Sequence, residues 1–142
     1  MKTFNLFLVL IMVLPILSCN AQTDSKVAIA QDKSDDNIEV YYFHLTTRCV
    51  TCKTIEAQAM ENLEALYPGQ MNEGLITFSS LNIEEEEGRA IADKLGVSGQ
   101  TLLLVKGDQK INLTNEGFMY AVAKPEKFRE IIKEKVDGLL TD

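Results

Sequence analysis

Two cysteines stand three positions apart in this chain, as Cys49 and Cys52. They follow an apolar, strand-like run (Ile38 to Leu45) and lead into a helix-like run (Thr54 to Leu66). On a helix, residues i and i+3 share one face with Cβ atoms about 5 to 6 Å apart, which is near the separation that a disulfide requires. The pair can therefore open and close with little backbone movement, and this predicts thiol–disulfide redox chemistry.

The two cysteines are expected to have different roles. Only a few per cent of an unperturbed cysteine, with a pKa near 8.5, is the nucleophilic thiolate at neutral pH. A helix start favours the anion through its unpaired N–H groups and its dipole, and Arg48 adds a neighbouring positive charge. We therefore predict that Cys49 attacks a target sulfur, and that Cys52, one turn inside the helix, resolves the mixed disulfide and leaves the pair oxidised.

Other roles for the pair remain open. A structural staple is disfavoured, because closing a four-residue loop contributes only about 2 kcal/mol, against nearly 5 kcal/mol for a loop of a hundred residues. The pair could be retained but idle. Two thiolates could also bind a soft metal or metalloid ion with His44 as a third ligand, but a closed zinc site takes four ligands. We therefore expect neither a metal site nor a cofactor.

Three further residues are candidates for supporting the cysteines, each with a plain structural alternative. Lys53 adds positive charge near the thiolate, or is an ordinary solvated helix residue. His44 relays protons, although a strand covered on both faces favours a buried core histidine. Thr101 presents backbone groups to an extended substrate, or merely begins a strand.

The remaining elements are those that must position the cysteine pair. Ile38 to Leu45 is typical of a central strand covered on both faces, which places Tyr41 and Tyr42 in the core. Apolar residues then recur at helical spacing as far as Pro68-Gly69. The elements expected after it are a strand (Leu75 to Ile83), a helix opened by Glu84 to Glu87 and ended by Gly96, a strand (Thr101 to Val105), a turn (Gly107-Asp108), a returning strand (Ile111 to Thr114) and a helix from Pro125. Four carboxylates in a row suit the positive end of a helix dipole better than a calcium site.

This order, βαβαββα, with C-x-x-C between the first strand and its helix, resembles the thioredoxin fold. Leu75 to Ile83 with the acidic residues after it, and Gly96-Val97-Ser98-Gly99 before Leu102 to Leu104, resemble the corresponding thioredoxin segments. The segment V-Y-Y-F-H-L-T-T-R-C-V-T-C-K-T-I-E is similar to the small thioredoxin-like family named nitrophenyl compound nitroreductase subunit ArsF. The resemblance implies an α/β, three-layer fold whose central mixed sheet of about four strands is flanked by helices.

Three features differ from thioredoxins. Arg48 stands where thioredoxins have tryptophan, and Val50-Thr51 where they have Gly-Pro. Gly99-Gln100-Thr101 contains no proline, whereas thioredoxins have a cis-proline opposite the cysteines. Counting back six positions from Cys49, to the buried acid of thioredoxins, gives Phe43. These differences concern the residues that handle substrate and protons.

The beginning of the chain predicts export. Met1-Lys2 and the apolar stretch from Phe4 to Leu17 have the charged start and apolar middle of a secretory signal, and the stretch is short for a membrane span. Ile16-Leu17-Ser18-Cys19 resembles a bacterial lipoprotein signal, which implies removal of the residues before Cys19 and lipidation of Cys19 itself. The alternative is an ordinary signal that is cleaved near Ala21.

The expected organisation is a signal peptide (residues 1–18), a lipidated cysteine with a flexible linker (19–37) and a thioredoxin-like domain (38–142). Loss of residues 1–18 removes one positive charge, that of Lys2, and changes the net charge from −7 to −8. Such acidity argues against nucleic acid and anionic membrane surfaces as partners.

The leading hypothesis is a lipid-anchored thiol–disulfide oxidoreductase outside the cytoplasm, on the periplasmic face of a bacterial envelope. Its partners would be protein thiols or disulfides and a membrane electron-carrier protein. One alternative is a non-catalytic binding module that holds a soft metal, arsenite or a partner through the dithiol. Another is a subunit of a reductase complex.

Overall fold

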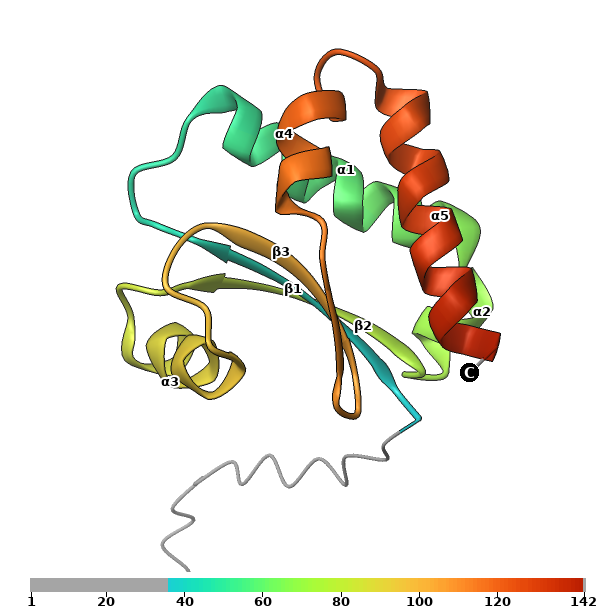
Figure 1. Ribbon diagram of the computed structural model, residues 1–142, viewed down its shortest axis with the longest axis horizontal. Coiled ribbons are helices and arrows are strands. Elements are labelled where there is room, and N and C mark those ends of the chain that lie inside the picture. Colours follow the sequence, from blue (N-terminus) through green and yellow to red (C-terminus); the bar gives the residue numbers. More distant parts are fainter. Residues whose placement is uncertain (1–35, 142) are drawn as a thin grey trace, which may run out of the picture. The chain divides into compact units, whose positions relative to one another are not determined.

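A four-stranded sheet lies at the centre of residues 36–141, the part of the chain that the computed structural model describes (Figure 1). Its spatial order is β2 (Ile76–Asn82), β1 (Ile38–His44), β3 (Thr101–Lys106) and β4 (Gln109–Asn112). Strand β1 runs parallel to β2 and antiparallel to β3, and β3 is antiparallel to β4. The predicted α/β fold with a central mixed sheet is confirmed, and it has the strand order of a thioredoxin-like domain.

Helices cover both faces of the sheet (Figure 1). One face carries α1 (Val50–Leu66), α4 (Thr114–Tyr120) and α5 (Pro125–Thr141), and the other carries α3 (Glu86–Leu95). A short helix, α2 (Pro68–Asn72), follows α1. Within residues 36–141, no helix is both long enough and apolar enough to cross a membrane.

Strand β1 supplies side chains to both cores, because successive residues of a strand point to opposite faces. Val40 and Tyr42 belong to the core under α1 and α5, and Tyr41 and Phe43 to the core under α3. The expected burial of Tyr41 and Tyr42 is confirmed, with 9% and 1% of their surface exposed. Strand β1, which leads into the cysteine pair, is therefore packed on both faces and paired on both edges.

The structure gives the bounds of the helices around the cysteine pair. Helix α1 begins at Val50 with Cys49 as its N-cap, so the pair stands at the helix start as expected. Helix α1 ends at Leu66, before Pro68-Gly69, as predicted, but Pro68 also opens the short helix α2, which was not expected; in a first turn its missing N–H costs nothing. Helix α3 begins at Glu86, so only two of the four expected carboxylates lie in its first turn, and it ends at Gly96 as predicted, with φ 75°.

The second half of the chain contains a helix that the sequence interpretation missed. The returning strand β4 ends at Asn112, and Thr114, which we expected to lie in it, begins α4 instead. The side chain of Asn112 accepts the N–H of Thr114 at 2.9 Å, which turns the chain out of the sheet. The Thr114 hydroxyl then accepts the N–H of Leu102 at 3.0 Å. The observed order therefore has two short helices more than βαβαββα.

Candidate functional site

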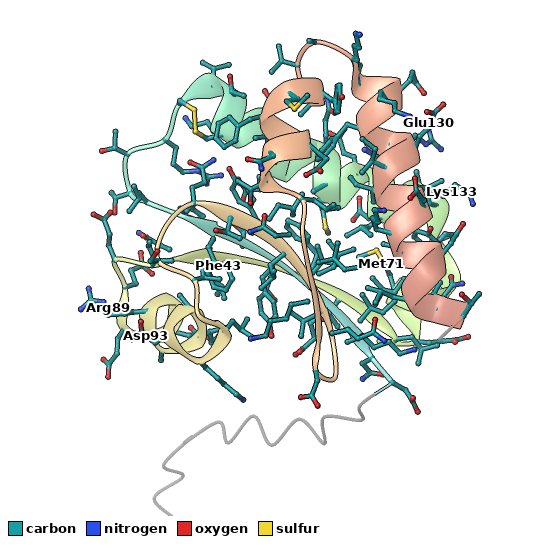
Figure 2. All side chains as sticks on the ribbon, in the orientation of Figure 1. Phe43, Met71, Arg89, Asp93, Glu130 and Lys133 are labelled. Carbon is teal, nitrogen blue, oxygen red and sulfur yellow. A yellow bond between two sulfur atoms is a disulfide. The ribbon has the colours of Figure 1, made fainter. Side chains whose placement is uncertain are left out.

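The first turn of α1 holds the cysteine pair. Cys49 is the N-cap residue of the helix, with extended backbone angles, and its Sγ accepts the N–H of Cys52 at 3.1 Å. The two sulfur atoms are joined in a disulfide, with the Cα atoms 5.1 Å apart, visible as the yellow bond at the start of α1 in Figure 2. The spacing of three positions thus brings the cysteines within bonding distance at the start of the helix.

The two sulfurs differ in access. Cys49 lies on the exposed side of the turn, whereas Cys52 is buried, with 6% of its surface exposed. Val50, between them, is 81% exposed, so the side chain next to Cys49 does not shield it. An incoming sulfur atom can therefore reach Cys49 far more readily than Cys52.

Tyr42 contacts Cys52 from the sheet. Its hydroxyl donates to the Cys52 carbonyl at 2.7 Å and accepts the side-chain amide of Gln100 at 2.5 Å. Burial raises the pKa of Tyr42, although the nearby Arg48 charge and the Gln100 amide oppose that rise. The phenol therefore stays protonated, and remains a hydrogen-bond donor, at the pH values where cysteines titrate.

Arg48 lies against the same cluster. Its guanidinium sits over the Tyr42 ring, 5.7 Å from the ring centroid, and forms an ion pair with Glu56 on the second turn of α1. Both side chains of this pair are largely shielded, at 18% and 24% exposed. The positive charge expected to favour a Cys49 thiolate is therefore balanced by a carboxylate.

The other candidate site residues occupy different surroundings. His44 is half-buried at the end of β1, with Nδ1 3.0 Å from the Leu45 carbonyl oxygen, so the expectation of a core histidine is wrong. The strand leaves the core immediately after Phe43. Thr101 is buried and donates its hydroxyl to the Gly99 carbonyl at 3.1 Å, and Lys53 is exposed.

The structure also corrects the position at which a buried acid was sought. Phe43, labelled in Figure 2, is fully buried in the core under α3, on the face of the sheet away from α1. The β1 residue that reaches Cys52 is Tyr42, one position earlier. Among residues 36–141, no carboxylate side chain is buried. The side chain beneath Cys52 is thus a neutral phenol.

Tyr42 and Gln100 were not singled out as site residues in the sequence. Tyr42 reads only as a core aromatic, and Gln100 only as part of a segment that lacks proline. Described residues contain no cis peptide bond, so the bond before Thr101 is trans. The described part of the chain also contains no group of three or more His, Cys, Asp or Glu side chains placed to hold a metal ion.

Comparison with known proteins finds solved structures of low sequence identity. No family model matches the chain, and no curated protein matches it. Thioredoxin from Trypanosoma brucei brucei is 24% identical over 71% of this chain and 80% of its own, with a TM-score of 0.41. A solved structure described as a malarial protein is also 24% identical, over 52% of this chain and 74% of its own, with a TM-score of 0.37. The strand order of the sheet and the helices on its two faces are what identify the architecture as thioredoxin-like.

Proposed function

We propose that the protein is a thiol–disulfide oxidoreductase in which Cys49 is the nucleophile and Cys52 the resolving cysteine. One observation carries the proposal. Cys49 is the exposed N-cap of a 17-residue helix, and its sulfur already accepts a backbone N–H of that helix. An anion at this position is stabilised by the hydrogen bond and by the helix dipole, which favours the reactive thiolate.

The reaction follows from the different access of the two sulfurs. In the reduced protein, the Cys49 thiolate attacks one sulfur of a target disulfide, and the second target sulfur leaves as a thiolate. The Cys52 thiol then loses its proton to that thiolate and attacks Cys49 Sγ, which expels the first target sulfur. The target gains two electrons and the pair is left as the Cys49–Cys52 disulfide. Starting from the oxidised protein and a dithiol target, the same steps run in reverse.

A trapping experiment tests this mechanism. In Cys52→Ser, Cys49 can still attack but nothing resolves the product, so mixed disulfides at Cys49 should accumulate and should be released by dithiothreitol. Cys49→Ser is the matched control, because it keeps one cysteine of the pair in its buried position. Equal trapping by both variants, or an empty trap in Cys52→Ser, would contradict the assigned roles.

We also propose that the protein acts outside the cytoplasm on a lipid anchor at Cys19. The support is the signal-like sequence of residues 1–19, which lies outside the described residues, as does Cys19 itself. A thiol–disulfide pair suits such an oxidising compartment. In a bacterial host, Cys19→Ala should move the exported protein from the membrane fraction to the soluble fraction; unchanged membrane association would rule out this anchor.

A narrower proposal concerns the partner. The similarity of residues 40–56 to the nitrophenyl compound nitroreductase subunit ArsF family supports a role as a subunit of a reductase, supplied by a membrane electron carrier. This segment contains the cysteine pair together with Tyr42, Arg48 and Glu56. Co-purification of a redox protein with the full chain from a detergent extract, lost on Cys49→Ser, is the expected result.

A further inference from the structure

One hydroxyl group joins the cysteine turn to the segment that precedes β3. The Tyr42 hydroxyl donates its proton to the Cys52 carbonyl and accepts from the Gln100 side chain, which lies 58 positions further along the chain. Gln100 comes directly before β3, whose residue Leu102 is the sheet partner of Tyr42. The turn and this segment are thus tied to the same residue of the central strand.

Cys52 is held on both sides of its Cα atom. Its N–H donates a hydrogen bond to Cys49 Sγ, and its carbonyl accepts one from the Tyr42 hydroxyl. Tyr42 has little freedom of its own, because the residue is 1% exposed and the Arg48 guanidinium lies over its ring. The orientation of the Cys52 backbone is therefore set by the sheet as well as by the helix.

The hydrogen bond from Tyr42 to the Cys52 carbonyl matters most in the reduced protein, in which the two sulfur atoms are not joined. In the oxidised protein the disulfide itself restricts Cys52, so the hydrogen bond from Tyr42 adds little restriction. In the reduced protein the covalent link is gone, and only the surrounding contacts keep Cys52 oriented toward Cys49. A dithiol that is held in bonding geometry loses less conformational entropy when it closes, and it therefore favours the disulfide.

We infer that Tyr42 and Gln100 are positioning residues for Cys52, which keep the reduced pair in bonding geometry and so make the protein a stronger reductant. The inference rests on the proposed redox function of the pair. The one proton of the phenol is engaged with a backbone carbonyl rather than with a sulfur atom, so the role is positional and does not involve proton transfer.

The test is the equilibrium of the full chain with glutathione. Two glutathione molecules reduce the Cys49–Cys52 disulfide to the dithiol and become one glutathione disulfide, and the two protein forms are separated by mass after alkylation. Tyr42→Phe should shift the equilibrium about five-fold toward the dithiol, which corresponds to about 1 kcal/mol. Gln100→Leu should shift the equilibrium in the same direction by about two- to three-fold. The effect is smaller because Tyr42 keeps its hydrogen bond to the Cys52 carbonyl and loses only the one from the Gln100 amide.

Tyr41→Phe is the matched control. It removes the same hydroxyl from the neighbouring residue of β1, where it donates to Glu39 at 2.9 Å and belongs to the opposite core. Its equilibrium should match that of the unmodified chain. The ratio of the Tyr42→Phe and unmodified constants should also be the same at pH 6, 7 and 8, because the phenol stays neutral throughout.

Several results would overturn the inference. These are a Tyr42→Phe constant within about 1.5-fold of the unmodified chain, an equal shift in Tyr41→Phe, or a ratio that changes with pH, which would indicate proton transfer. If Tyr42→Phe fails to fold, Gln100→Leu carries the test, since Gln100 is only half-buried. The glutathione equilibrium requires no protein substrate, so an empty Cys52→Ser trap would refute the proposed function without affecting this measurement.

Discussion

The reactivity of Cys49 gives the most direct test of the site. The perturbation is Cys52→Ser, which leaves one thiol in the described domain at the N-cap of α1. The reference is a synthetic peptide with the sequence of residues 46–56 and the same serine, because it keeps both Arg48 and Glu56 but is too short to form a stable helix. Comparing the two isolates what the helix contributes to the thiolate.

The size of that contribution follows from two contacts. The helix dipole favours an exposed anion at its start by about 0.3 to 1 kcal/mol. The Cys52 N–H, 3.1 Å from Cys49 Sγ, contributes about 1 kcal/mol once solvent exposure is allowed for. The charge of Arg48 adds nothing to this sum, because Glu56 balances it. A total of about 1.3 to 2 kcal/mol raises the ratio of thiolate to thiol by about 10- to 30-fold.

The assay is the rate of alkylation by iodoacetamide at three pH values. A thiolate of lower pKa is also a weaker nucleophile, so part of the gain is lost. The folded variant should react about four- to five-fold faster than the peptide at pH 6 and about three-fold faster at pH 7, but about three-fold slower at pH 9, where both are ionised. Equal rates at all three pH values, or rates that never cross, would refute stabilisation by the helix start.

Two further predictions concern the scaffold. A Cβ atom at Gly88 would lie 2.1 Å from the Asn82 carbonyl oxygen, a backbone atom that no side-chain rotation can move, so Gly88→Ala should lower the free energy of unfolding by about 2 to 3 kcal/mol in urea denaturation. Gly138→Ala, in α5 with nothing within 4 Å, should instead raise it by about 0.5 to 1 kcal/mol, and a loss in both would show that the clash is not the cause. Hydrogen bonds from Thr46 lower the pKa of Glu84, so its carboxylate stabilises the fold above the unfolded pKa of about 4.5, and that contribution is lost as the pH falls through the lower, folded value. The destabilisation caused by Glu84→Gln should therefore be present at pH 7 and disappear in acid; a difference that persists below about pH 3 would contradict this assignment.

Local patterns in the sequence were enough to predict most elements. The strand-like run before the cysteines, the apolar residues at helical spacing after them and the glycine that ends α3 each reflect physics that acts within a few residues. Helix α4 was missed because its stabilising contacts are not local. Gly117 packs on the side chain of Ile55, and Gln58 donates to the Ala121 carbonyl at 2.7 Å, so α1 holds this short helix in place.

The residue beneath Cys52 is not the one that counting along the chain indicates. Six positions back from Cys49 leads to Phe43, which lies in the core under α3. The residue that reaches Cys52 is Tyr42, one position earlier. Neighbouring residues of a strand point to opposite faces of the sheet, so an error of one position in the count leads to the wrong core. Counting residues does not give the path of the loop between β1 and α1, and it is this path that decides which β1 residue lies beneath Cys52.

For this protein, the sequence by itself determined the reactive pair, since two cysteines at helical spacing after a strand need only local geometry to meet. Only the tertiary structure decided what surrounds the pair. The Tyr42–Gln100 hydrogen bond joins residues 58 positions apart, and Arg48, which precedes α1, is neutralised by Glu56 on the second turn of that helix. Such contacts depend on which face each side chain takes once the sheet and helices have packed, and that is a property of the whole fold.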